Sequence, residues 1–168
     1  MKSIASPLSI KVADEVWVAT ALLHREHPKR ADFTVAEIVA RAERESITGS
    51  LRPGVYQHAI QHAVANVPRS PNRYKLLFAT APDRRRLYRP GDPCDSDRAG
   101  SKTVPRRDDL PERYRLLLDW YADTYVRQSS LRDRIKNDPI LAMIGLGKEI
   151  WKDETADEYV RRLREEWD

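Results

Sequence analysis

The chain has 168 residues, 40% of them hydrophobic and 33% charged, with a formal net charge of +4. This balance suits one domain of ordinary size, or a small domain with an appendage. The single cysteine, Cys94, excludes an intramolecular disulfide and every zinc site built on several cysteines. No apolar run approaches the roughly 20 residues that span a bilayer, and the N-terminus is a poor signal peptide, so we expect a soluble cytoplasmic protein.

Charge is distributed unevenly along the chain. Residues 1–110 contain 19 Lys and Arg against 13 Asp and Glu, whereas residues 111–168 contain 11 against 13. The first part therefore has the basic excess of a module that binds a polyanion, and the second part does not.

Three helices are predicted near the start of the chain. Apolar residues at helical spacing predict the first over residues 12–27. Thr34 and Glu37 have the spacing of a capping box, which predicts that a second helix begins there. Pro53 suits the first turn of a third helix over residues 53–66.

A β-hairpin is predicted next, with strands over residues 74–79 and 85–88 and a turn at 80–83. Three helices followed by a hairpin resemble a winged helix-turn-helix domain. We therefore expect a mainly α fold with a small β-hairpin, in which residues 10–90 form a basic, winged-helix-like domain.

This resemblance implies binding to operator DNA. A short helix rich in Gln and His could lie in a major groove, and an Arg-rich hairpin could contact phosphates. The predicted nucleic-acid-binding residues are Arg52, Gln57, His58, Gln61, Arg84, Arg85 and Arg86. The same topology also serves as a protein-docking module, so a structural or protein-binding role for this domain stays open.

The rest of the chain divides into three predicted segments. Residues 91–110 are rich in Pro, Gly, Ser and Asp and are interpreted as a linker. Residues 111–137 contain an amphipathic helix, and residues 138–168 form a compositionally separate tail. The apolar stripe of the helix consists of Tyr114, Leu117, Leu118, Tyr121 and Tyr125.

No catalytic, cofactor or metal motif stands out. His58 and His62 have the spacing of helical metal ligands, but no third ligand accompanies them. Asp92, Asp95 and Asp97 resemble part of a calcium loop that lacks its bidentate Glu. The sequence therefore indicates a binding protein rather than an enzyme, with no cofactor and no metal.

The tail ends in a short amphipathic helix. Thr155 and Glu158 form a second potential capping box, and the helix that follows places Tyr159, Leu163 and Trp167 on one face. Helices this short are marginal in water, so the helix must pack on this chain or on a partner. Trp, Tyr and Arg are the residue types that dominate binding hot spots.

Two motifs in the tail carry a family resemblance. Gly145-Leu146-Gly147-Lys148-Glu149-Ile150-Trp151, followed after a short spacer by Asp157-Glu158-Tyr159-Val160-Arg161-Arg162-Leu163-Arg164-Glu165-Glu166-Trp167, resembles the toxin-neutralising tail of VapB-type antitoxins. Those proteins pair with PIN-domain ribonuclease toxins in type II toxin–antitoxin systems. The first 110 or so residues depart from the short DNA-binding domain typical of that family.

The resemblance implies how the tail would act. A PIN active site is a carboxylate cluster that holds magnesium, and an antitoxin tail can send a basic side chain into it. The residues that match are Lys148, Trp151, Tyr159, Arg161, Arg162, Leu163, Arg164 and Trp167. The leading hypothesis is thus an antitoxin that can form homo-oligomers and bind DNA. The alternatives are a winged-helix transcription regulator whose last helices dimerise or complete the fold, and a nuclease with an unrecognised carboxylate site.

Overall fold

The computed structural model describes residues 10–68, 74–136, 138–142 and 155–165. The chain divides into two compact units, an N-terminal unit, Met1–Val126, and a C-terminal unit, Arg127–Asp168. In chain order, the N-terminal unit contains helix α1 (Val12–Glu26), strand β1 (Phe33–Thr34), α2 (Val35–Glu45), α3 (Gly54–Gln57) with a π-helical turn (His58–His62), β2 (Leu77–Ala81), β3 (Arg84–Leu87), 3₁₀ turns at Ser96–Arg98, Arg107–Asp109 and Glu112–Tyr114, and α4 (Leu116–Trp120) with a π-helical turn (Tyr121–Val126).

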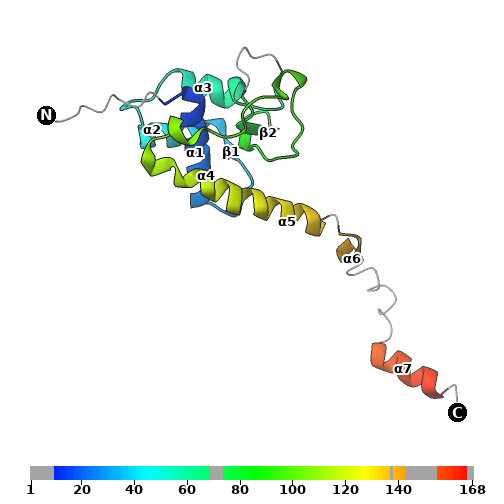
Figure 1. Cartoon of the computed structure of the whole chain (residues 1–168). Coiled ribbons are helices and arrows are strands. Elements are labelled where there is room, and N and C mark those ends of the chain that lie inside the picture. The colour runs from blue at the N-terminus through cyan, green and yellow to red at the C-terminus, as the bar shows by residue number, and fades with distance from the viewer. Residues whose placement is uncertain (1–9, 69–73, 137, 143–154, 166–168) are drawn as a thin grey trace. The chain divides into compact units, whose positions relative to one another are not determined.

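The fold is mainly helical with one small antiparallel sheet of order β1-β3-β2 (Figure 1). The predicted hairpin is confirmed as β2 and β3, although its first strand begins at Leu77 rather than Tyr74. Strand β1 was not predicted. It has only two residues, Phe33 and Thr34, which pair with Arg85 and Arg84.

Helix α1 lies at the centre of the N-terminal unit. It contacts α2, α3, β3 and α4, and so its side chains are buried on nearly every face. Trp17 is fully buried and packs edge-on against Tyr121, with the ring centroids 5.9 Å apart. A helix surrounded in this way is expected to be apolar all round, yet α1 also buries Asp14 and Glu15. Both carboxylates reach cations on other segments.

The capping box at the start of α2 is confirmed. Thr34 Oγ1 accepts a hydrogen bond from the Glu37 amide at 3.1 Å, and the Glu37 carboxylate accepts one from the Thr34 amide at 2.8 Å. Arg30 adds two contacts to that carboxylate, at 2.6 and 3.0 Å. These hydrogen bonds depress the pKa of Glu37 to about 2. Helix α2 ends where Ser46 adopts the left-handed conformation.

The third helix ends at His62, earlier than predicted, and two buried arginines satisfy its last carbonyls. Arg85, on β3, donates from Nε to the Ala59 carbonyl and from Nη2 to the Ile60 carbonyl, both at 3.1 Å. Arg98 donates to the Gln61 carbonyl at 2.9 Å and to the His62 carbonyl at 3.0 Å. Carbonyls at a helix C-terminus lack intrahelical donors and carry partial negative charge, so guanidinium groups suit them in number and sign.

Arg98 also holds the chain that follows the helix. It donates to the carbonyls of Val67 and Tyr74 at 3.1 and 2.8 Å. Burial lowers the pKa of both Arg98 and Arg85 from the ordinary arginine value, because removal from water penalises the charged form. Two cations are thus placed inside the N-terminal unit, with main-chain carbonyls around them.

The interpretation of residues 91–110 as a linker is wrong. Arg98 and Leu110 are buried, at 2% and 0% exposure. Lys102 Nζ lies 2.6 Å from Asp14 on α1, and its carbonyl accepts a hydrogen bond from the Lys75 amide at 2.9 Å. The segment has few apolar residues because polar groups attach it to the helices, and composition alone does not reveal such contacts.

The apolar stripe predicted after residue 111 is confirmed, because its residues face the core. Tyr114, Leu117, Tyr121 and Tyr125 are all buried, and Leu118 is partly buried. The tyrosine hydroxyls also find partners, because Tyr121 donates to the Tyr88 carbonyl at 2.5 Å and Tyr125 to the Leu87 carbonyl at 3.1 Å. The π-helical turn over Tyr121–Val126 interrupts the single helix that was predicted.

The C-terminal unit contains α5 (Arg127–Lys136), α6 (Pro139–Ala142) and α7 (Ala156–Glu165). Among the described residues of the chain, no helix has the length and apolar character required to cross a membrane.

The two-arginine cap predicts a large loss of stability in Arg98→Met. The substitution keeps an unbranched side chain but removes the Arg98 donor from four main-chain carbonyls, of which, among the described residues, only that of Gln61 also accepts from a main-chain amide, that of Val64 at 3.1 Å. Each buried acceptor that loses its donor costs about 1–3 kcal/mol. We expect the free energy of unfolding in urea to fall by about 3 kcal/mol or more. The matched control is Arg107→Met, which removes the exposed Arg107–Asp119 pair and should cost less than about 1 kcal/mol. Equal losses in the two variants would contradict the cap.

His24 predicts a pH dependence of stability. Its ring lies between Phe33 and Tyr125, at 4.9 and 4.8 Å, and burial together with Arg89 and Arg86 lowers its pKa to about 3. Below about pH 6.5, His24 is protonated in the unfolded chain but remains neutral in the folded chain. The free energy of unfolding therefore falls by up to about 1.4 kcal/mol per pH unit as the pH is lowered. His24→Phe should flatten the unfolding free energy between about pH 6.5 and 5 relative to the unsubstituted chain. Identical slopes would show that His24 does not contribute.

Candidate functional site

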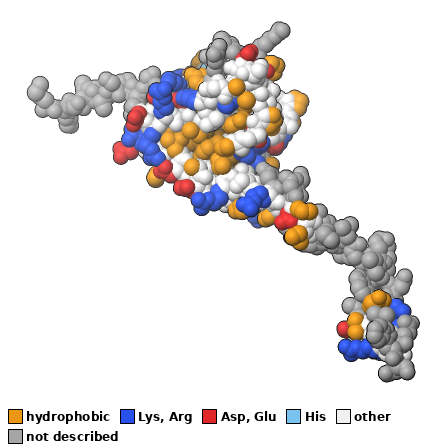
Figure 2. All heavy atoms as spheres, turned by 45° about the vertical axis from the view of Figure 1, so that its right-hand side comes forward, with side chains coloured by type: hydrophobic (Ala, Val, Ile, Leu, Met, Phe, Trp, Pro, Cys, Tyr) orange, Lys and Arg blue, Asp and Glu red, His pale blue; other side chains and the backbone are white. Residues whose placement is uncertain are grey.

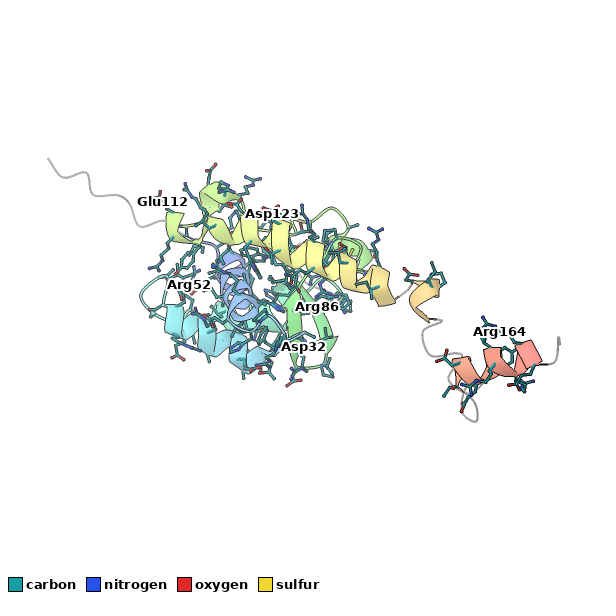
Figure 3. The ribbon with its side chains drawn as sticks, turned by 90° about the horizontal axis from the view of Figure 1, so that it is seen from below. Asp32, Arg52, Arg86, Glu112, Asp123 and Arg164 are labelled. Carbon is teal, nitrogen blue, oxygen red and sulfur yellow. The ribbon has the colours of Figure 1, made fainter. Side chains whose placement is uncertain are left out.

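The first candidate surface is the one predicted for nucleic acid, on the third helix and the hairpin. Figure 3 labels Arg52 near the start of the third helix and Arg86 and Asp32 by the sheet, so these residues do not meet at one point.

Arg52 forms a salt bridge with a buried carboxylate. Its Nε and Nη2 lie 2.8 and 2.5 Å from Glu15 Oε2, and the Glu15 side chain is fully buried in α1. The other carboxylate oxygen of Glu15 is buried without a hydrogen-bond partner. Arg52 therefore compensates an internal charge.

The polar residues of the third helix are only partly available. Gln57 is exposed, whereas His58 and Gln61 are half-buried. His58 Nδ1 lies 2.9 Å from the Gly54 carbonyl, and burial lowers the pKa of His58. Tyr56, which the sequence reasoning did not single out, is 51% exposed. The accessible face of this helix is thus uncharged.

The three hairpin arginines also have internal partners. Arg84 Nε lies 2.7 Å from Asp32 Oδ1, and Arg86 makes two contacts with Asp92, at 2.6 and 2.7 Å. Arg85, which was predicted to bind nucleic acid, is 3% exposed and donates to carbonyls, so its guanidinium is not available to a phosphate. Asp92 lies in a Pro-Gly-Asp sequence shortly after the hairpin. It was not predicted to be the partner of Arg86.

The second candidate surface is α7, whose described side chains are all exposed. Tyr159 is 38% and Val160 44% exposed, and Arg161, Arg162 and Arg164 project into solvent. Figure 2 shows hydrophobic and basic side chains together on this helix at the C-terminal end of the chain, and Figure 3 labels Arg164 on it. The helix thus offers apolar and cationic contacts at once.

Local interactions stabilise α7. Thr155 and Glu158 form the predicted capping box, with the Thr155 amide 2.8 Å and the Thr155 hydroxyl 2.7 Å from the Glu158 carboxylate. Those hydrogen bonds lower the pKa of Glu158. The guanidinium of Arg162 lies 5.2 Å from the centroid of the Tyr159 ring, within range of a cation–π contact. The first turn of the helix is therefore stabilised by residues of the helix and its cap, while its described side chains are exposed.

Four of the predicted toxin-binding residues are placed by the structure as exposed side chains of α7, namely Tyr159, Arg161, Arg162 and Arg164. Leu163 lies in α7, but its side chain is outside the described part. Lys148, Trp151 and Trp167 lie outside the described residues altogether.

In the described part of the chain, no group of three or more His, Cys, Asp or Glu side chains could hold a metal ion. The rings of His58 and His62 are 5.1 Å apart between centroids and meet edge-on.

Comparison with known proteins gave no matching family model, no significantly similar curated protein and no significantly similar solved structure.

The Arg52–Glu15 pair predicts that Arg52 contributes to stability. Arg52→Ala leaves the Glu15 carboxylate buried without its cation, which should lower the free energy of unfolding by about 3 kcal/mol. Combining it with Glu15→Gln removes the buried charge, so the double variant should be the more stable of the two in urea denaturation. Gln57→Ala, on an exposed neighbour, serves as the control. An Arg52→Ala variant as stable as this control would contradict the prediction.

Proposed function

We propose that the chain is the antitoxin of a type II toxin–antitoxin system and that its C-terminal unit binds and inhibits a PIN-domain ribonuclease. The observation that carries the proposal is α7, a capped amphipathic helix whose described side chains are all exposed. The resemblance of its sequence to VapB-type tails supplies the class of partner.

Physical reasoning supports a binding role for α7. A helix of 10 residues is marginal in water without a packing surface, and the apolar side chains of α7 that the structure describes, Tyr159 and Val160, are 38% and 44% exposed. On a partner the same side chains would be buried. The capping box limits the ordering entropy that such binding costs, because the first turn is already formed.

Inhibition would follow from charge. Arg161, Arg162 and Arg164 can present guanidinium groups to a carboxylate cluster, where charge-assisted hydrogen bonds are strong. A guanidinium in that cluster occupies the oxygens that would hold magnesium and blocks the path of the RNA substrate. Tyr159 and Leu163 would anchor the helix beside the active site.

The N-terminal unit is proposed to be a winged-helix domain. Its element order and its sheet order β1-β3-β2 support this, with the third helix in the recognition position and β2 and β3 as the wing. Operator binding would then depend on the exposed side chains of Tyr56 and Gln57 more than on the predicted cations, because those cations have internal partners.

The same sheet order favours a second candidate function, a transcription regulator whose C-terminal helices dimerise or complete the fold. The two candidates differ in what residues 138–168 do. Deleting them should abolish toxin neutralisation and leave the N-terminal unit folded if the chain is an antitoxin. For a regulator, the deletion should unfold or dissociate the protein and neither chain should neutralise a toxin, so toxin neutralisation is the measurement that separates the two candidates.

Tyr159 tests the proposed function directly. Tyr159→Ala removes an exposed aromatic anchor of a type that typically costs about 2 kcal/mol at a hot spot, so the affinity for the PIN-domain protein encoded beside this chain should fall at least about tenfold. Isothermal titration measures the affinity, and growth of cells that co-express both proteins measures protection. Tyr56→Ala is the matched control, since it removes an exposed tyrosine from the N-terminal unit. If both variants bind and protect like the unsubstituted chain, α7 is not the inhibitory element.

A further inference from the structure

A second apolar surface lies on α5 and α6 and is not explained by toxin binding through α7. Leu131 and Ile135 on α5 and Ile140 on α6 are 49%, 58% and 74% exposed. They border one open groove, which we call the α5–α6 groove. Its described lining is Leu131, Arg134, Ile135, Asp138, Pro139 and Ile140.

The exposed apolar side chains are concentrated rather than scattered. Single exposed apolar residues are ordinary on protein surfaces, but a contiguous cluster marks a surface that another molecule covers. Leu131 and Ile135 are four residues apart and share one side of α5. Ile140 extends that cluster across the break between α5 and α6. The groove therefore has the character of an uncovered interface.

The charges beside the groove indicate its occupant. Arg134 and Asp138 both line it, four residues apart and with opposite signs. Among the described side chains, no ion pair joins Arg134 to a carboxylate, and Asp138 accepts a hydrogen bond from the Ile140 amide at 2.8 Å. Among its described side chains, the groove thus has one positive and one negative charge, an arrangement that is complementary to itself when turned around a two-fold axis.

We infer that the α5–α6 groove is covered by the same groove of a second copy of this chain. In an antiparallel two-fold arrangement, Arg134 of each copy faces Asp138 of the other, and Leu131, Ile135 and Ile140 are buried between them. An interface of this kind is isologous, so each contact occurs twice. The inference goes beyond the proposed function and does not depend on it, because it concerns α5 and α6 rather than α7.

The size of the surface sets the strength of the association. Ten residues of chain cover much less than the roughly 800 Å² that each partner contributes to a standard interface. The dimer is accordingly of the weak, concentration-dependent class. It would bring two N-terminal units together, which is how winged-helix proteins address paired half-sites.

Charge reversal on the full-length chain tests the inference. Sedimentation equilibrium should show dimers for the unsubstituted chain at high micromolar concentration. Arg134→Glu places a glutamate opposite Asp138 of the other copy, and Asp138→Arg places an arginine opposite Arg134. Each variant alone should therefore dimerise at least about tenfold more weakly. The double variant restores opposite charges and should dimerise again. An equimolar mixture of the two single variants should form mixed dimers for the same reason.

A control variant distinguishes loss of the ion pair between the two copies from loss of the hydrogen bond that Asp138 accepts within one copy. Asp138→Asn retains an acceptor for the Ile140 amide without the charge, and it should weaken the dimer less than Asp138→Arg does. Far-ultraviolet circular dichroism confirms that each variant keeps its helices.

Two results would overturn the inference. The first is an unsubstituted chain that stays monomeric at every concentration, with Leu131→Asp lowering affinity for the PIN-domain protein instead, which would assign the groove to that partner. The second is a double variant that remains as weak as the single ones. The Tyr159→Ala measurement is unaffected by either result, so failure here is separable from failure of the proposed function.

Discussion

The guanidinium groups of Arg85 and Arg98 supply the hydrogen bonds that the last turn of the third helix cannot make for itself. Carbonyls 59–62 receive donors from residues 25 to 37 positions away in the chain. Arg85 comes from β3 and Arg98 from the segment after the hairpin, so one helix end joins the sheet and the later segment to the helical part. Removing either cation would leave buried carbonyls unpaired, which costs more than the bonds contribute when made.

Internal pairing of cations also changes what the basic charge implies about binding to a polyanion. The excess of Lys and Arg in residues 1–110 suggests a positive face, but several of these cations have internal carboxylate partners. Arg52 pairs with Glu15, Lys102 with Asp14 and Arg86 with Asp92. Net charge governs long-range attraction to a polyanion, whereas contact with one requires exposed cations. The paired cations Arg52, Arg86 and Lys102 therefore add to the net charge more than to the contact surface.

Features set by neighbouring residues could be predicted from the sequence, and features set by distant ones could not. Both capping boxes follow from a Thr and a Glu three residues apart, and the inward stripe of Tyr114, Leu117, Tyr121 and Tyr125 follows from helical spacing. Composition cannot show that an arginine will serve as an internal donor, which is why residues 91–110 were interpreted as a linker. The two-residue strand β1 has no pattern to detect, since its place is fixed by pairing with β3. At the candidate site, α7 was predictable because its cap and its apolar and basic residues are local.

Hydrogen exchange of the α7 amides, measured with and without a PIN-domain protein of the proposed partner class, is the direct test of whether α7 is kept exposed for binding. We expect rapid exchange in the free chain, because the described side chains of α7 are exposed, and strong protection in the complex. The amides of α1 should be protected in both states, since that helix is buried. Protection of α7 equal to that of α1 in the free chain, or no gain in protection on mixing, would contradict the claim that this helix is kept exposed for a partner.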